Sequence, residues 1–168
     1  RQMCIRDRVK LMLDPLADPY SNNTSNNEVL KFGASDVFDL SKIQLLNSYT
    51  CTECGRCTSE CPANQTGKKL SPRKIMMDTR DRLEEVGKNI DKNNGEYKPD
   101  GKQLLNNHIT SEELWACTSC NACVQACPIG IDPLSIIMDM RRYLVMEQSA
   151  APSELNLSLI HISEPTRR

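Results

Sequence analysis

The chain has 168 residues, a formal net charge of −1 and 26% charged side chains, and this length suits one domain. Because no extended basic patch accompanies this charge, nucleic acid is not expected as a partner. The sequence contains no signal-peptide pattern and no apolar run of about 20 residues, so no membrane span is predicted within it.

Both ends of the chain resemble translated adapter sequence. Residues 1–8 back-translate onto a common transposase adapter of library preparation, and residues 157–168 onto its opposite-end version. We therefore set both segments aside as not native, as is done with a fusion scar. The alternative is a genuine N-terminal arm and C-terminal tail. The native part is then expected over residues 9–156, truncated at both ends, and Cys4 falls outside it.

Residues 9–35 read as a polar linker. Pro15 and Pro19 break the segment, and residues 21–27 form a low-complexity run of Ser, Asn and Thr. Such a composition cannot bury a core. We expect this segment to tether the following domain to a missing upstream region.

Helical spacing of apolar residues begins near residue 36. Asp36 or Ser35 is expected to cap a helix whose stripe contains Val37, Leu40, Ile43, Gln44, Leu45 and Leu46. This helix should lead through Tyr49 and Thr50 into the first of two cysteine motifs.

The two cysteine motifs share one pattern. Residues 51–62 read C-x2-C-x2-C-x3-C-P, and residues 117–128 repeat it. With this spacing a chain wraps a 4Fe–4S cubane, and in two-cluster proteins the fourth cysteine binds the other cluster. We therefore assign one cluster to Cys51, Cys54, Cys57 and Cys127, and the other to Cys117, Cys120, Cys123 and Cys61. Because the motifs exchange a ligand, they should fold as one unit.

Helix-capping residues mark the elements around the motifs. After a loop over residues 63–70, Ser71 and Pro72 predict the start of a helix that runs to about Val86 and stops near Gly87. Residues 87–102 have loop composition. The capping box of residues 110–113 predicts a short helix into the second motif.

A last helix is predicted from residues 132–133 and should end by residues 149–152. The unit of helix, cysteine motif and helix thus occurs twice, and no alternating strand pattern separates the two copies. We predict an all-α two-cluster domain over residues 36–151 with approximate two-fold pseudosymmetry. Residues 152–156 begin a truncated downstream region.

Zinc and disulfides are the alternative uses of eight cysteines. Zinc ribbons pair C-x2-C with a distant C-x2-C, which suits four cysteines closing with C-P poorly. Disulfides form in oxidising compartments, whereas two complete cluster motifs favour a reducing one. No nucleophile–base pair, phosphate loop or dinucleotide fingerprint is found, so no catalytic residue is assigned within the chain.

Several neighbours of the motifs are candidates for shaping the cluster sites. Gly55 and Gly130 stand where the backbone must turn sharply or approach a cluster. Arg56 either offsets cluster charge, contacts a partner or is a solvated side chain. Shielding from water is expected of Trp115, Ile129 and Ile131.

The motifs and their flanking helices resemble the alpha-helical ferredoxin domain. This domain occurs in iron–sulfur subunits of succinate dehydrogenase and fumarate reductase, in the C-type subunit of heterodisulfide reductase, and in glycolate oxidase. Succinate dehydrogenase typically lacks one cysteine of its second motif, whereas this chain has Cys120, so two 4Fe–4S clusters are expected. Tyr49–Pro62, Ser71–Arg80 and Leu134–Ala151 look most like bacterial heterodisulfide reductase-related iron–sulfur proteins.

This resemblance implies how the domain is used. Proteins of this group often carry membrane helices before the domain and cysteine-rich CCG domains after it. It therefore implies a domain on the cytoplasmic side, attached to the membrane through a missing N-terminal region, with redox partners that contain flavin or CCG domains.

Electron transfer through two clusters, as part of a larger heterodisulfide reductase-like oxidoreductase, is the favoured function. A hydroxy-acid (glycolate-type) or succinate/fumarate-type oxidoreductase is the alternative whole protein. A structural module that binds zinc in place of iron is the third and less favoured function.

Overall fold

Helices and turns form all the regular structure of residues 32–153, the part of the chain that the computed structural model describes. The elements are η1 (Val37–Asp39), α2 (Lys42–Thr50), α3 (Arg56–Ser59), α4 (Pro62–Gln65), α5 (Pro72–Lys92), η2 (Leu104–His108), α6 (Ser111–Ala116), α7 (Ala122–Ala126) and α8 (Pro133–Met146). The predicted all-α class is confirmed. The predictions for residues 1–8, 9–31, 154–156 and 157–168 lie outside the described residues.

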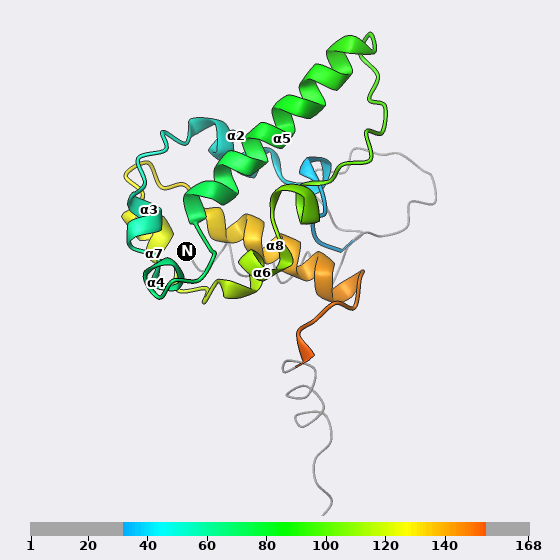
Figure 1. The fold of residues 1–168 in the computed structure, drawn as a ribbon. Helices are drawn as coiled ribbons and strands as arrows, with labels where there is room; N and C mark the ends of the chain where they lie inside the picture. Colours follow the sequence, from blue (N-terminus) through cyan, green and yellow to red (C-terminus); the bar gives the residue numbers. More distant parts are fainter. Residues whose placement is uncertain (1–31, 154–168) are drawn as a thin grey trace, which may run out of the picture. The chain divides into compact units, whose positions relative to one another are not determined.

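The two long helices, α5 and α8, cross and pack against each other (Figure 1). Both start as predicted. Ser71 Oγ accepts from the N–H of Lys74, an Asp132 carboxylate oxygen accepts from the N–H of Ser135, and a proline follows each cap. Each cap satisfies a backbone donor that the first turn leaves unpaired.

The predicted end of α5 at Gly87 is wrong, because the helix continues through Gly87 to Lys92. It ends where the N–H of Asn93 bonds to the carbonyls of Asn89 and Ile90. The next residues, Asn94 and Gly95, have φ values of +57° and +97°. The left-handed turn that terminates the helix therefore lies at residues 94–95, since a glycine stops a helix only where the backbone takes that conformation.

The single helix predicted from residue 36 is wrong in its continuity. Two capping boxes divide it, one from Asp36 to Asp39 at η1 and one from Ser41 to Gln44 at α2. The predicted stripe is also only partly the buried face of α2, since Ile43 and Leu46 are 71% and 62% exposed. Gln44, the polar member of that stripe, is buried, and its amide donates to Asp139 Oδ2 at 2.6 Å.

The hydrophobic core lies among α5, α8 and η2. It includes fully covered side chains such as Ile75, Met76, Leu104, Leu114, Ile136, Ile137 and Met140. None of the helices described in residues 32–153 is long and apolar enough to cross a membrane.

Two similar halves surround the cysteine motifs. The first half contains α2, α3 and α5, with α4 between the last two, and the second half contains α6, α7 and α8 in the same order. The predicted capping box at Thr110 and Glu113 opens α6. The short helices α3 and α7, which were not predicted, pack side by side and bring the two motifs together (Figure 1).

Candidate iron–sulfur sites

The two cysteine loops have the same backbone course. α2 ends directly before Cys51 and α6 directly before Cys117. Two residues after the first cysteine of each loop, the φ angle is positive, +57° at Glu53 and +56° at Ser119. The repeated cysteine spacing therefore corresponds to a repeated loop conformation.

A second left-handed position follows in each loop and caps the short helix after it. Gly55 (φ +81°) precedes α3, and Asn121 (φ +63°) precedes α7. Gly and Asn are the residues that tolerate this conformation best. The predicted sharp turns at Gly55 and Gly130 (φ +73°) are confirmed, whereas Asn121 was missed because its motif has no glycine there.

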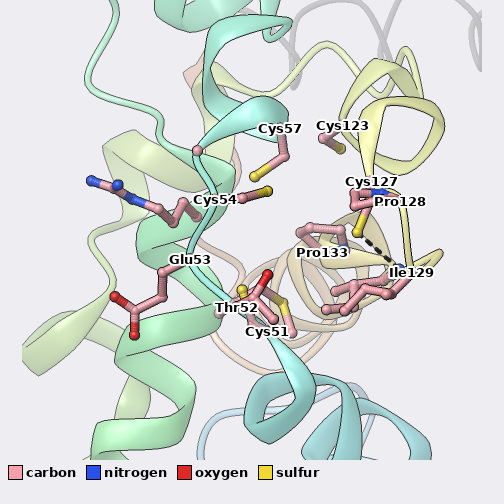
Figure 2. A pocket seen from close by; sticks show the side chains of 14 residues that line it. Cys51, Thr52, Glu53, Cys54, Cys57, Cys123, Cys127, Pro128, Ile129 and Pro133 are labelled. Atoms are coloured by element: carbon pink, nitrogen blue, oxygen red, sulfur yellow. Dashed lines mark hydrogen bonds between the residues drawn. The ribbon is translucent and has the colours of Figure 1, made fainter.

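The first cavity is lined by cysteines from both motifs. Cys51, Cys54 and Cys57 come from the first loop, and Cys123 and Cys127 from the second. Figure 2 shows their sulfur atoms gathered around one space, with Pro128, Ile129 and Pro133 beside them.

The second cavity also mixes the motifs. Cys117, Cys120 and Cys123 line it together with Cys61 from the first motif. Its other walls are largely apolar and include Leu70, Pro72, Leu134 and Ile137. Cys61 lines only the second cavity and Cys127 only the first, which is the placement that the predicted ligand exchange requires. Which cysteine binds which cluster stays a prediction.

Electrostatic interactions divide the thiols into the same two sets. Burial raises the pKa of the Cys57 thiol, and the charges of Cys51, Cys54 and Cys127 raise it further. Burial likewise raises the pKa of Cys123 to about 12, with further contributions from Cys117, Cys61 and Cys120. Cys123 lines both cavities, but its charge interactions place it with the second set.

The donor set fits iron–sulfur clusters. All eight cysteines of the described residues are free thiols. No three His, Cys, Asp or Glu side chains within residues 32–153 converge on one point closely enough to hold a single ion. The thiolates of a cubane each bind a different iron, so they stand farther apart than four ligands around one zinc. The arrangement therefore suits two cubanes better than two zinc ions.

Backbone N–H groups donate to the sulfur atoms of Cys117 and Cys127, the first and last cysteines of the second motif. The N–H of Ser119 donates to Cys117 Sγ, and the N–H of Ile131 donates to Cys127 Sγ, each at 3.4 Å. Figure 2 marks the second of these bonds. Such bonds favour the thiolate that a metal needs.

The predicted shielding residues differ in exposure. Ile131 is buried and lines the first cavity, and Trp115 is half-buried. Ile129 also lines this cavity but is 54% exposed, so it covers the site less completely than predicted. Arg56 is exposed, in agreement with a solvated side chain.

Sequence reasoning missed two arginines that hold the cysteine loops. Arg80 on α5 donates to Glu53 Oε1 at 2.6 Å, and Arg141 on α8 donates to the carbonyls of Leu114 and Cys117. A signal was present in the sequence, because Arg80 and Arg141 stand equally far beyond the prolines that open their helices, Pro72 and Pro133.

Comparisons with known proteins agree with this site. Residues 50–131 match the family described as "4Fe-4S dicluster domain". The chain is 32% identical to "Probable iron-sulfur-binding oxidoreductase FadF" of Bacillus subtilis, over 78% of this chain and 23% of the relative. It is 31% identical to "EtfAB:quinone oxidoreductase" of Syntrophomonas wolfei, over 89% of this chain and 23% of the relative.

A shorter relative comes from Methanosarcina acetivorans. It is the C-type subunit of that organism's ferredoxin/F(420)H(2)-dependent CoB-CoM heterodisulfide reductase, and it is 28% identical over 71% of this chain and 60% of the relative. The chain thus spans about a quarter of the first two relatives' length. Residues 50–131 therefore belong to the 4Fe-4S dicluster domain family, and the chain is an iron–sulfur protein with two 4Fe–4S clusters, related to the C-type subunit of heterodisulfide reductase.

Proposed function

We propose that this domain passes electrons between two redox partners through its two clusters, as one part of a larger oxidoreductase. The observation that carries the proposal is that the two cysteine cavities adjoin, since Cys123 lines both. When bound, each 4Fe–4S cluster supplies one reversible one-electron couple. The chain's own contribution is to hold the two couples side by side and to exclude water from them.

The proposed ligands are those of the sequence assignment. Cys51, Cys54 and Cys57 hold one cluster with Cys127, and Cys117, Cys120 and Cys123 hold the other with Cys61. The cavity linings and the charge interactions of Cys57 and Cys123 support this division. Cys4 is left out.

Electrons are proposed to enter and leave the domain at the second cysteine of each motif, Cys54 and Cys120. Cys54 and Cys120 are exposed, whereas Cys61 and Cys123 are buried. Transfer to a partner is fastest where the least protein separates the clusters from the surface, and these two loops meet that condition. The two exposed thiols belong to different proposed clusters, so one can face a donor and the other an acceptor.

The partners of the whole protein are inferred from its relatives. One relative's name describes a quinone oxidoreductase of EtfAB, and "Probable membrane-anchored ferredoxin" of Chromohalobacter salexigens is 34% identical over 73% of this chain and 20% of the relative. We propose redox partners that contain flavin or CCG domains, and membrane attachment through an N-terminal region upstream of residue 9, with this domain on the cytoplasmic side.

Metal analysis of the full chain, purified without oxygen, tests the proposal. We expect about eight irons and eight acid-labile sulfides per chain, and EPR of the dithionite-reduced protein should show two interacting clusters. Zinc in place of iron, or clusters that dithionite and stronger reductants leave unreduced, would contradict electron transfer.

Four cysteine variants test the ligand exchange. Cys61→Ser should leave the same EPR signal as Cys123→Ser, because both remove a ligand of one cluster, and a different signal from Cys57→Ser. Cys4→Ser is the matched control and should keep the full iron content. If Cys61→Ser resembles Cys57→Ser instead, each motif binds its own cluster and the exchange is wrong.

A further inference from the structure

Arg141 on α8 holds the start of the second cysteine loop with several hydrogen bonds. Its Nε and Nη2 donate to the carbonyl oxygen of Leu114 at 3.0 and 2.6 Å, and Nη2 also donates to the carbonyl oxygen of Cys117. Nη1 reaches Ser119 Oγ at 3.4 Å. The guanidinium carbon lies 5.1 Å from the ring centre of Trp115, which covers one side of the group.

The positive charge of Arg141 is not neutralised by these contacts. Within residues 32–153, each atom that accepts a hydrogen bond from it is a neutral oxygen of Leu114, Cys117 or Ser119. Burial lowers the pKa of Arg141, and the charge of the Cys117 thiolate acts in the opposite direction. Because the guanidinium binds the backbone carbonyl of Cys117 itself, its positive charge lies beside a proposed cluster ligand.

The first half of the molecule places an arginine at the equivalent position but neutralises it. Arg80 follows Pro72 at the same distance as Arg141 follows Pro133, and Glu53 takes the loop position that Ser119 takes in the second half. Arg80 Nη2 and Glu53 Oε1 lie 2.6 Å apart. The two halves thus share a backbone and an arginine but differ in whether a carboxylate faces it.

The Arg80–Glu53 pair also lies to one side of the first cavity. Figure 2 shows the Glu53 carboxylate directed away from the cysteine sulfurs. The hydrogen bond that Arg80 donates to Glu53 raises the pKa of Arg80, and the charges of Glu53, Asp81 and Glu84 act in the same direction.

We infer that Arg141 raises the reduction potential of the cluster bound by the Cys117 loop, and that Arg80 has no equivalent effect on the other cluster. Reduction adds one electron and breaks no bond, so a fixed cation beside the ligand loop stabilises the reduced state by its charge. Arg141 touches a ligand's backbone and not the cluster, so it is a positioning and charge-setting residue. The inference rests on the proposed function and its ligand assignment.

A second arginine, Arg73, lies near the first cavity, so the inference concerns only the cluster of the second cavity. Arg73 lines that cavity, but its side chain is exposed and water screens its charge. The inference therefore concerns what Arg141 adds to its own cluster, and it does not order the two potentials.

Potentiometric titration with dithionite, followed by EPR, tests the inference on the full chain. Arg141→Gln should lower the potential of one reduction step while the other step stays in place. The expected change is about tenfold in the ratio of reduced to oxidised cluster at a fixed potential, or ~59 mV for a one-electron couple. The step that moves should be the one whose signal Cys123→Ser abolishes.

Arg142→Gln is the matched control. It removes the same charge from the adjacent residue, whose guanidinium bonds to Asp139 Oδ1 at 3.0 Å on α8. It should move neither step. An equal shift in Arg142→Gln would mean that the potential follows net charge alone, and the inference would be wrong.

Arg141→Lys separates charge from mechanical support. Lysine keeps the charge but cannot reproduce the forked donation to Leu114 and Cys117. Its potential should stay closer to the wild type than that of Arg141→Gln, and an equal loss in both variants would overturn the role of charge. If both variants lose the second cluster by iron and sulfide analysis, Arg141 is a structural residue and the inference fails. If the wild-type chain holds no pair of reducible clusters, the proposed function fails with it.

Discussion

Arg82 and Asp36 lie 46 positions apart in the chain, yet their side chains form a two-bonded ion pair. Nε of Arg82 donates to Oδ1 of Asp36 at 3.1 Å, and Nη2 donates to Oδ2 at 3.0 Å. The Arg82 side chain is fully buried, and Asp100 binds its other edge. This single guanidinium therefore joins α5 to the segment that enters the domain and to the loop before η2.

Arg82→Met should be among the most destabilising substitutions in the domain. It leaves two carboxylates facing a site with no cation, and removing one member of a buried pair costs about 3–5 kcal/mol. Thermal unfolding of the cluster-loaded protein, followed by circular dichroism, measures the change. Lys88→Met on the exposed side of α5 is the control. The Lys88 side chain is 72% exposed, and its ion pair with Glu84, at 3.8 Å, is long and solvated. Equal losses in both variants would contradict the role of Arg82.

The pH dependence of Asp100 provides a second test of this network. Hydrogen bonds from Arg82 hold the pKa of Asp100 below its ordinary value of 3.8. A depressed folded-state pKa stabilises the protein above the unfolded value, and this stability is lost as the pH falls through the folded value. The stability difference between wild type and Asp100→Asn should therefore stay constant from about pH 8 to about pH 5 and close only below about 4.

Thermal unfolding at several pH values measures this difference. Asp91→Asn is the control, since Asp91 lies exposed near the end of α5. It should melt like the wild type throughout. A stability difference for Asp100→Asn that already closes between about pH 8 and about pH 5 would mean that another group titrates with it.

Several features of the fold that depend on residues close together in the sequence were predicted correctly. The helix starts at Ser71 and Asp132, and the capping box at Thr110, depend on bonds within four residues and were predicted correctly. The cysteine spacing likewise predicts the family, because each loop wraps its site locally.

Interactions between distant residues account for what the sequence did not predict. Gln44 on α2 is buried where it bonds to Asp139, 95 residues away, whereas Ile43 of the same predicted stripe is exposed, and apolar spacing alone does not show this difference. Arg141 has a recognisable place beyond Pro133, but nothing local shows that its partners are carbonyls of residues 114 and 117. The charge difference between the two halves becomes visible only when both loops are folded.

Lys74 and Glu113 should couple the two halves energetically. Lys74 lies in the first turn of α5, and its ammonium bonds to Oε1 of Glu113, while Glu113 Oε2 accepts from the N–H and the hydroxyl of Thr110 at 2.9 Å. A double-mutant cycle of Lys74→Met and Glu113→Gln should give a coupling of about 1 kcal/mol, because the Glu113 side chain is only 6% exposed, although that of Lys74 is 43% exposed.

The neighbouring pair of Lys69 and Glu112 is the control for this cycle. It joins the same two regions at 2.7 Å, but its side chains are 70% and 67% exposed. Water screens such pairs, so we expect no measurable coupling. Equal coupling in the two cycles would show that burial of Glu113 does not strengthen its ion pair.

Gly33 should tolerate no side chain, because α8 passes directly beside it. A Cβ atom there would collide with the carbonyl oxygen of Asp139 and the backbone nitrogen of Tyr143. The same carbonyl accepts from the N–H of Ala34 at 3.1 Å, so the collision would also separate the entering segment from α8. Gly33→Ala therefore combines an unfavourable backbone conformation, at φ +83°, with a displaced helix.

Gly67→Ala isolates the contribution of the backbone conformation. Gly67 has nearly the same φ, +78°, and nothing lies within 4 Å of the position its Cβ would take. We expect Gly67→Ala to cost about 1–2 kcal/mol, the conformational term alone, and Gly33→Ala about 1–3 kcal/mol more. Denaturant unfolding of the two variants measures the difference. If Gly33→Ala costs no more than Gly67→Ala, the entering segment does not pack on α8 as closely as the structure places it. The bond between Ala34 and Asp139 would then contribute little to holding the two together.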